Sequence, residues 1–321
     1  MSKTRSKSLI KIALCGLGVL VALVPILQVG AVAAERVFTV PLDKLREWSA
    51  GITTSMNVQI LGHSAVHDEP SDCEMHLGAK AADYTGDPAG WVLEPMNLCL
   101  EPFPGKSTAS KKDWESFGDD LKQAKVHVEG VPRIWPEHLV GGRGPSNPNH
   151  ALELHPLTRL QRGPNDYKFS SFIYAPDKLE GISDKTIRSI LTDSEVSVTE
   201  KDGEVEINLD TGTIGNFAIV DLSFSTSAIK AMDGGFRIDG EAVLSRKESV
   251  PVSLVMVGDC DIGKSVAELR GRKQKKYSFE ALVLFSLNPV ALYQAAKTSN
   301  GKEVAVPDPI QLIVYGETGS Q

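Results

Sequence analysis

Apolar and polar residues alternate in five short runs between residues 56 and 160, which is the pattern of strands that bury one face. In chain order the runs are MNVQILGH, CEMHLGAK, GWVLEP, KVHVEGVPRIW and HALELHPLTRL. The pattern changes between the third run and the fourth. In STASKKDWESFGDDLKQ, Trp114, Phe117 and Leu121 share one helical face, and Ser110 stands before them as a cap. Five strands and one helix are therefore predicted.

Five strands with the single helix between the third and the fourth are the order of an OB-fold barrel. Gly130, inside the fourth run, indicates the bulge or bend that a small closed barrel needs. A short strand pattern, RVFTV, and a helical pattern, LDKLREWSA, precede the five runs. We therefore predict an OB-fold-like domain over residues 35–162.

Strand patterns also dominate residues 163–321, where we predict a β-rich sandwich or barrel domain with minor helices. The segment SEVSVTEKDGEVEINLD indicates a hairpin, because Lys-Asp-Gly separates two alternating runs. Two short helices are predicted, at SDKTIRSIL and at NPVALYQAAK, where Asn288 is the cap and Pro289 takes the first helical position. The fold class is therefore mainly β.

The two halves differ in composition, which supports a boundary at LQRGPNDY, residues 160–167, where Gly-Pro-Asn-Asp also indicates a turn. All histidines and all tryptophans precede residue 156: His63, His67, His76, His127, His138, His150, His155, Trp48, Trp91, Trp114 and Trp135. Any chemistry that uses imidazole is therefore expected in the first half.

Residues 1–34 have the composition of a signal peptide: four cations without an acid, an apolar stretch, and small residues in AVAAE. We predict cleavage after Ala33 or Ala34, and a periplasmic or extracellular protein. The alternative is an uncleaved anchor, because Ile12 to Ala34 is uncharged and long enough to span a bilayer. A membrane partner is expected only through such an uncleaved leader.

The formal net charge is −7, and removal of the four leader cations takes it to −11. An acidic surface repels phosphate backbones, which argues against nucleic acid as a partner. Three cysteines remain after cleavage, and Cys73 with Cys99 is the natural pair in an oxidising compartment, which leaves Cys260 as an odd thiol. The alternative that all three are reduced stays open.

The strongest candidate site starts at NHALELHPL. In a strand, Leu152 and Leu154 point to the core, whereas Glu153 and His155 lie side by side on the other face. The second strand repeats this spacing with Glu74 and His76.

The histidine after the fourth strand, His138, adds a further imidazole. Where the second, fourth and fifth strands meet, we expect His76, His138, Glu153 and His155 to converge. Three imidazoles and a carboxylate suit zinc or another divalent metal, which activates water when one position is left open. The alternative is a hydrogen-bonded polar cluster without chemistry, or one that contacts a ligand.

The segment VHVEGVPRIWPEH followed by NPNHALELHPLTRL resembles the closing strands of OB-fold-like domains of uncharacterised exported bacterial proteins. These end in an aromatic or aliphatic residue followed by Glu-Ile/Leu-His-Pro. The matching positions are Leu152, Glu153, Leu154, His155 and Pro156, with Arg133, Trp135, Glu137 and His138 upstream. The resemblance covers residues 57–162, and it implies a fold but no reaction.

Three other motifs have simpler explanations. INLDTGT contains the Asp-Thr-Gly of aspartic proteases, but such enzymes need a second carboxylate, and Asp210 is better explained by a turn. LRGRKQKKY, residues 269–277, is interpreted as a solvated loop rather than an anion site. The loop VGGRGPSNPN borders the predicted binding face, and Arg143 in this loop is a candidate for binding an anionic ligand.

These observations predict an exported protein that binds an unknown ligand or protein. The predicted contact residues are His76, Arg133, Trp135, Glu153 and His155. The competing hypothesis is a metal-dependent hydrolase, acting on phosphodiesters, that uses His76, His138, Glu153 and His155. A third hypothesis is a scaffold that works through its second half.

Overall fold

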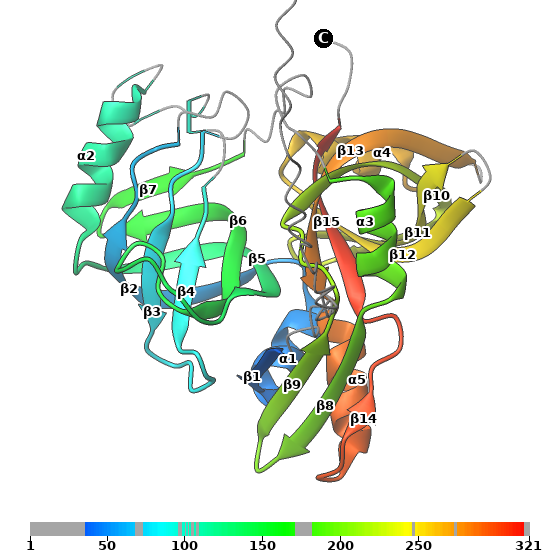
Figure 1. Ribbon diagram of the computed structural model, residues 1–321. Helices are drawn as coiled ribbons and strands as arrows, with labels where there is room; N and C mark the ends of the chain where they lie inside the picture. The colour runs from blue at the N-terminus through cyan, green and yellow to red at the C-terminus, as the bar shows by residue number, and fades with distance from the viewer. Residues whose placement is uncertain are drawn as a thin grey trace, which may run out of the picture. The chain divides into compact units, whose positions relative to one another are not determined.

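The computed structural model is shown in Figure 1. It describes residues 36–67, 73–95, 98, 99, 101, 103, 106, 109–170, 182–245, 248–272 and 275–317. The predicted signal peptide, residues 1–34, lies outside the described residues. The described part is mainly β, as predicted.

Six strands that follow one another in the sequence form one sheet. They are β2 (Thr54–His63), β3 (Leu77–Ala81), β4 (Gly90–Leu93), β5 (Lys125–His138), β6 (His150–Arg162) and β7 (Asn165–Lys168). Their order is β4-β3-β2-β5-β6-β7, and β4 also pairs with β6 in parallel. Because of this additional pairing, the two ends of the β4-to-β6 series meet.

The helix α2 (Lys111–Leu121) lies between β4 and β5 along the chain. Ser110 caps it with a capping box, in which the Ser110 side chain accepts from the Asp113 backbone N–H and the Asp113 side chain accepts from the Ser110 backbone N–H. Trp114, Phe117 and Leu121 are its buried face, as their spacing predicts.

A closed five-stranded barrel forms in the second half (Figure 1). It consists of β10 (Phe217–Met232), β11 (Gly235–Ser245), β12 (Glu248–Val257), β15 (Ile310–Glu317) and β13 (Lys276–Leu287), in that order. The helix α4 (Asp261–Leu269) joins β12 to β13, and α3 (Asp184–Thr192) precedes the barrel. The sequence patterns predict α3 but not α4.

A third sheet combines the start of the described chain with the second half. Its order is β1 (Arg36–Pro41), β9 (Glu204–Asp210), β8 (Glu195–Lys201) and β14 (Val304–Ala305). The helix α1 (Leu42–Ala50) packs against α5 (Pro289–Ser299). The predicted hairpin is the β8–β9 pair, and its turn uses the left-handed residues Asp202 and Gly203.

Two strand pairings cross the predicted domain boundary at residue 162. First, β1 and α1 fall within 35–162 but pair with elements of the second half, because RVFTVP supplies an edge partner for β9. Second, the predicted boundary segment is the turn of a hairpin, since β6 pairs with β7 across Gly163. Residues Ala33–Gln321 group as one compact unit.

Candidate functional site

The strand β6 carries the centre of the candidate site. Glu153 and His155 alternate with Leu152 and Leu154, as the period of two predicts. All four are buried, and each of the two polar side chains is only 2% exposed. Buried charged groups need partners, because the charged form loses its hydration.

Arg133 is the cationic partner of Glu153. The β5–β6 register places the two residues opposite each other, and Arg133 Nη1 donates to Glu153 Oε2 at 2.5 Å. The same guanidinium donates from Nε to the backbone oxygen of Phe285 at 2.8 Å and from Nη2 to that of Asn216 at 3.2 Å. Arg133 therefore ties the first sheet to the barrel.

His155 joins two carboxylates. Its Nδ1 lies 2.6 Å from Glu94 Oε2 and 3.3 Å from Glu153 Oε2. Glu94 follows β4 directly, and its backbone N–H donates to Leu154, which extends the parallel pairing of β4 with β6. On the other side of Glu153, His150 Nε2 lies 3.2 Å from Oε1. We call Glu94, Arg133, His150, Glu153 and His155 the inner network.

A second group lies at the more exposed end of this network, and we call His67, Glu74 and His76 the outer patch. Glu74 Oε1 lies 3.1 Å from His76 Nε2 and 3.4 Å from His67 Nδ1. Backbone bonds from Ser64 to His76 and from His67 to Glu74 continue the β2–β3 ladder, which holds the three side chains together. His76 Nε2 is 3.6 Å from Glu94 Oε1, so the two groups touch.

A disulfide fixes the segment that carries the outer patch. Cys73, next to Glu74, is bonded to Cys99, and the Leu98 backbone N–H donates to the Cys73 carbonyl. The predicted pairing of these cysteines is confirmed, and Cys260 is a buried free thiol.

The charges of the network shift each other's proton affinities. Burial acts to lower the pKa of His76, but the hydrogen bond to Glu74 and the charge of Glu94 outweigh it and raise the pKa to about 9. For His155, burial is likewise outweighed by Glu94 and Glu153, which raise the pKa to about 10.

The pKa values of the two glutamates shift in the opposite direction, below their usual range. Burial acts to raise the pKa of Glu74, and hydrogen bonds from His67 and His76 overcome it and lower the pKa. Against the same effect of burial, Arg133 holds the pKa of Glu153 well below its usual range. Without a bound ion, the network is therefore a chain of ion pairs.

The structure brings some predicted site residues together and separates others. Arg133, Glu153 and His155 meet in the inner network, whereas Trp135 stacks on Phe285 of the barrel, with ring centroids 6.0 Å apart. These four are buried, so of the predicted contact residues only His76 is partly exposed. Ligand contact by these side chains stays a prediction.

The four predicted metal ligands, His76, His138, Glu153 and His155, do not form one cluster. Among the described residues, two sets of three donors lie within 4.8 Å of one another: His67, Glu74 and His76, and Glu74, Glu94 and His155. Glu153 and His138 belong to neither set. The His138 ring lies against His150, with centroids 5.3 Å apart, and burial lowers its pKa.

Glu94 and His67 belong to the site, but the sequence patterns do not single them out. Glu94 ends the apolar run GWVL and precedes a proline, so a charged residue at the end of a buried strand was the available signal. His67 has no periodic pattern around it. Of the other motifs, Asp210 is exposed at the end of β9, and Arg143 is exposed in its loop.

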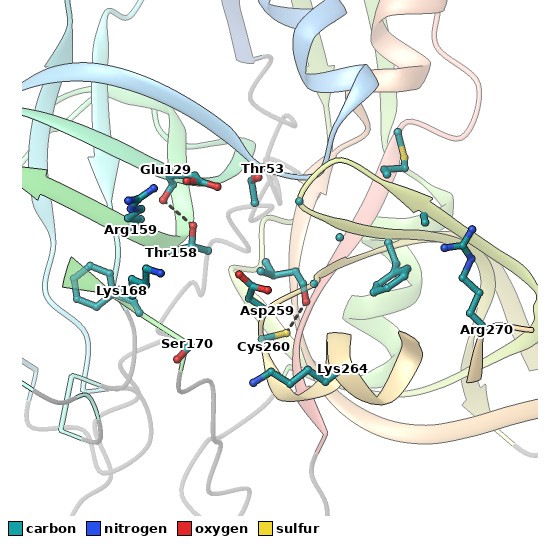
Figure 2. A pocket seen from close by; sticks show the side chains of 18 residues that line it. Thr53, Glu129, Thr158, Arg159, Lys168, Ser170, Asp259, Cys260, Lys264 and Arg270 are labelled. Carbon is teal, nitrogen blue, oxygen red and sulfur yellow. Dashed lines mark hydrogen bonds between the residues drawn. The ribbon is translucent and has the colours of Figure 1, made fainter. Parts of the chain in front are cut away.

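A cavity of about 780 Å³ lies elsewhere, between β6–β7 and the α4 end of the barrel (Figure 2). Cys260 at its wall caps α4: its Sγ–H donates to the Val257 carbonyl at 2.9 Å, and Sγ accepts from the Gly263 N–H at 3.4 Å. Burial raises the pKa of this thiol to about 11, so it stays protonated at neutral pH and is a poor nucleophile.

Cations outnumber acids around this cavity. Figure 2 shows Arg159 and Lys168 on the sheet side, and Lys264 beside Cys260 on the barrel side. Arg159 is already held by Asp166, through bonds of 2.7 and 2.9 Å. None of the predicted site residues lines the cavity.

Comparison of the chain with protein-family models, curated proteins and solved structures found no match. Within the described ranges, which start at residue 36 and leave short internal gaps, no helix has the length and apolar character needed to cross a membrane. The interpretation of the site therefore rests on its geometry.

Proposed function

We propose that this chain is an exported binding protein with an OB-fold-like first half, and that the outer patch binds a divalent transition-metal ion of the zinc class. The observation that carries the proposal is the convergence of three donor atoms. His76 Nε2 lies 3.1 Å from Glu74 Oε1, and His67 Nδ1 lies 3.4 Å from the same oxygen.

The donor spacing is that of a metal's ligand shell. Zinc binds imidazole nitrogen and carboxylate oxygen at about 2.0–2.2 Å, so that tetrahedral ligands lie about 3.4 Å from one another. Two imidazoles and one carboxylate are also the donor set of open zinc sites, whereas calcium and magnesium prefer oxygen ligands alone. The chemistry of the donors therefore favours the zinc class.

The inner network places a further carboxylate beside the proposed ion. Glu94 Oε1 lies 3.6 Å from His76 Nε2, the atom that would bind the metal, and Glu94 Oε2 accepts from His155 Nδ1. His155 is held in turn by Glu153, and Glu153 by Arg133. This series of contacts fixes the position of Glu94 next to the outer patch.

Strand pairing and the leader support the remaining parts of the proposal. The ring of pairings β2–β3–β4–β6–β5–β2, with β4 and β6 parallel and α2 before β5, has the connectivity of a small Greek-key barrel. The disulfide fits an oxidising compartment, as the leader composition does.

Binding is the function that the donor geometry supports, because three donor atoms within 4.8 Å of one another suffice to hold an ion. Hydrolysis would need, in addition, a cleft that holds a substrate beside the metal.

Calorimetric titration of EDTA-treated protein with zinc tests the proposal. The wild type is expected to bind one ion, and His76→Gln is expected to weaken binding about a hundredfold or more, since loss of an outer-shell partner alone costs about 10–100-fold. His127→Gln is the matched control, because His127 contacts Asn57 on the sheet and lies outside the patch. Absence of binding by the wild type, or equal affinities in the wild type and His76→Gln, would contradict the proposal.

A further inference from the structure

A second buried arginine lies in the barrel, away from the histidine/glutamate site. Arg237 on β11 is 8% exposed and lines a cavity of about 380 Å³. Arg133, the other buried arginine among the described residues, is paired with a carboxylate. Arg237 is not, and this difference needs a physical explanation.

The hydrogen bonds of Arg237 use one side of its guanidinium. Nη1 donates to Asn288 Oδ1 at 3.2 Å and to Gln311 Oε1 at 3.1 Å, both neutral acceptors. The buried Nε has no hydrogen-bond partner among the described residues. Nε is therefore an enclosed donor without a partner in the described part of the chain, and a guanidinium with unpaired N–H groups matches carboxylate oxygens.

The acids near Arg237 do not neutralise it. Asp239, whose charge acts on Arg237, is bound to Lys230 through a 2.7 Å contact, and Asp308 is exposed at the rim of the cavity. Burial lowers the pKa of Arg237, which reflects the cost of keeping this charge away from water. An anion in the cavity would offset that cost.

The cavity also selects the kind of anion. Because Lys230 is paired with Asp239, Arg237 is the cation of the lining that is left for a ligand, and one cation matches a monoanion better than a dianion. Much of the remaining lining is apolar: Leu191, Pro251, Val252, Val290 and Ile310. A monocarboxylate with a short alkyl chain satisfies both features, whereas a phosphate dianion satisfies neither.

We propose that this cavity binds a small aliphatic monocarboxylate, with the carboxylate against the guanidinium of Arg237 and the alkyl chain along the apolar wall. The start of α5 contributes to the same site. Asn288 caps that helix through the Val290 N–H at 3.1 Å and also holds Nη1, which fixes the guanidinium in place.

Titration of the purified protein with sodium hexanoate tests this proposal, with hexanol and inorganic phosphate as comparison ligands. The expected result is saturable binding of hexanoate, observed by calorimetry and as a shift of the Arg237 Nε–H resonance, which is identified by its loss in Arg237→Lys. Binding of hexanol or phosphate should be about tenfold weaker or more.

Two variants separate the site from general effects on the fold. Arg237→Met should abolish hexanoate binding, and Arg237→Lys should weaken it about tenfold because a lysine lacks the planar fork. Arg272→Gln is the control, because Arg272 is exposed and contacts Glu268 at the end of α4. An unmoved Nε–H resonance in the wild type, unchanged affinity in Arg237→Lys, or tighter binding of phosphate than of hexanoate would overturn the proposal.

Discussion

His155 Nδ1 lies 2.6 Å from Glu94 Oε2, and the other oxygen of the same carboxylate lies 3.6 Å from His76 Nε2 of the outer patch. His155 comes from β6, whereas Glu94 follows β4, so the contact depends on the parallel pairing of these strands. The ring of His155 also lies edge-on to Tyr315 of the barrel, with centroids 5.9 Å apart. The barrel therefore contacts the residue that holds Glu94 beside the proposed metal site.

Glu153→Gln is expected to destabilise the protein by about 3–5 kcal/mol, because it leaves the buried Arg133 guanidinium without its carboxylate. Urea denaturation measures the change. Asp119→Asn is the matched control: this carboxylate is exposed and contacts Lys122 at 2.7 Å, so its loss should change the stability much less than the loss of Glu153 does. Equal effects of the two substitutions would contradict the importance of the buried pair.

Stability is expected to fall at alkaline pH. The folded-state pKa values of His76 and His155, about 9 and about 10, lie above the ordinary value of 6.5. Each therefore contributes stability that is complete below pH 6.5 and is lost as the pH rises through 9 to 10. Thermal denaturation at a series of pH values measures this decline in stability, and His155→Gln should make it smaller. A wild-type stability that stays constant from pH 6.5 to 10 would contradict the prediction.

The lowered pKa values of two glutamates predict that stability also falls at acid pH. Glu74 and Glu153 have lowered pKa values, so their contributions are present above pH 4.5 and are lost as the pH falls through the folded-state values. Glu153→Gln is expected to remove part of this acid dependence, as measured by thermal denaturation below pH 5. An unchanged acid dependence in that variant would contradict the assignment.

Zinc affinity is expected to rise with pH. His76 is protonated at pH 7 in the metal-free protein, and zinc binds only the neutral imidazole, so binding displaces a proton. The apparent affinity should increase about tenfold per pH unit between pH 7 and the His76 pKa. Calorimetry in buffers of different ionisation enthalpy measures how many protons are released when zinc binds. Release of no proton would argue against His76 as a ligand.

Gly78→Ala is expected to destabilise the protein by about 1–3 kcal/mol through overpacking. Gly78 lies on β3, and a Cβ there would collide with the backbone of Pro145 and Ser146 in the loop that crosses it. Gly212→Ala is the control, because a Cβ at Gly212 meets nothing within 4 Å. Denaturation midpoints measure both, and similar values would contradict the close approach.

Local patterns predicted much of the fold. The period of two placed Glu153 and His155 on one face, and the cap signals located α2 and α5. The helix α4 was missed because its cap is a cysteine, which is not among the usual capping residues, and Gly263 falls in its first turn.

The composition of the site was harder to predict, because it depends on pairing between distant strands. Glu94 reaches His155 only through the parallel pairing of β4 with β6, and no local pattern encodes that pairing. The burial of Arg133 and Trp135 follows from the barrel packing against them. The pairing of β1 with β9 is also long-range, and no local pattern predicts it.

A crystal structure of zinc-soaked protein, with diffraction measured above and below the zinc absorption edge, tests the central claim most directly. The account predicts one anomalous peak at about 2.0–2.2 Å from His67 Nδ1, His76 Nε2 and a Glu74 oxygen. His127→Gln crystals should keep the peak, and His76→Gln crystals should lose it. An empty outer patch in the wild type, or zinc bound only at other side chains, would contradict the account.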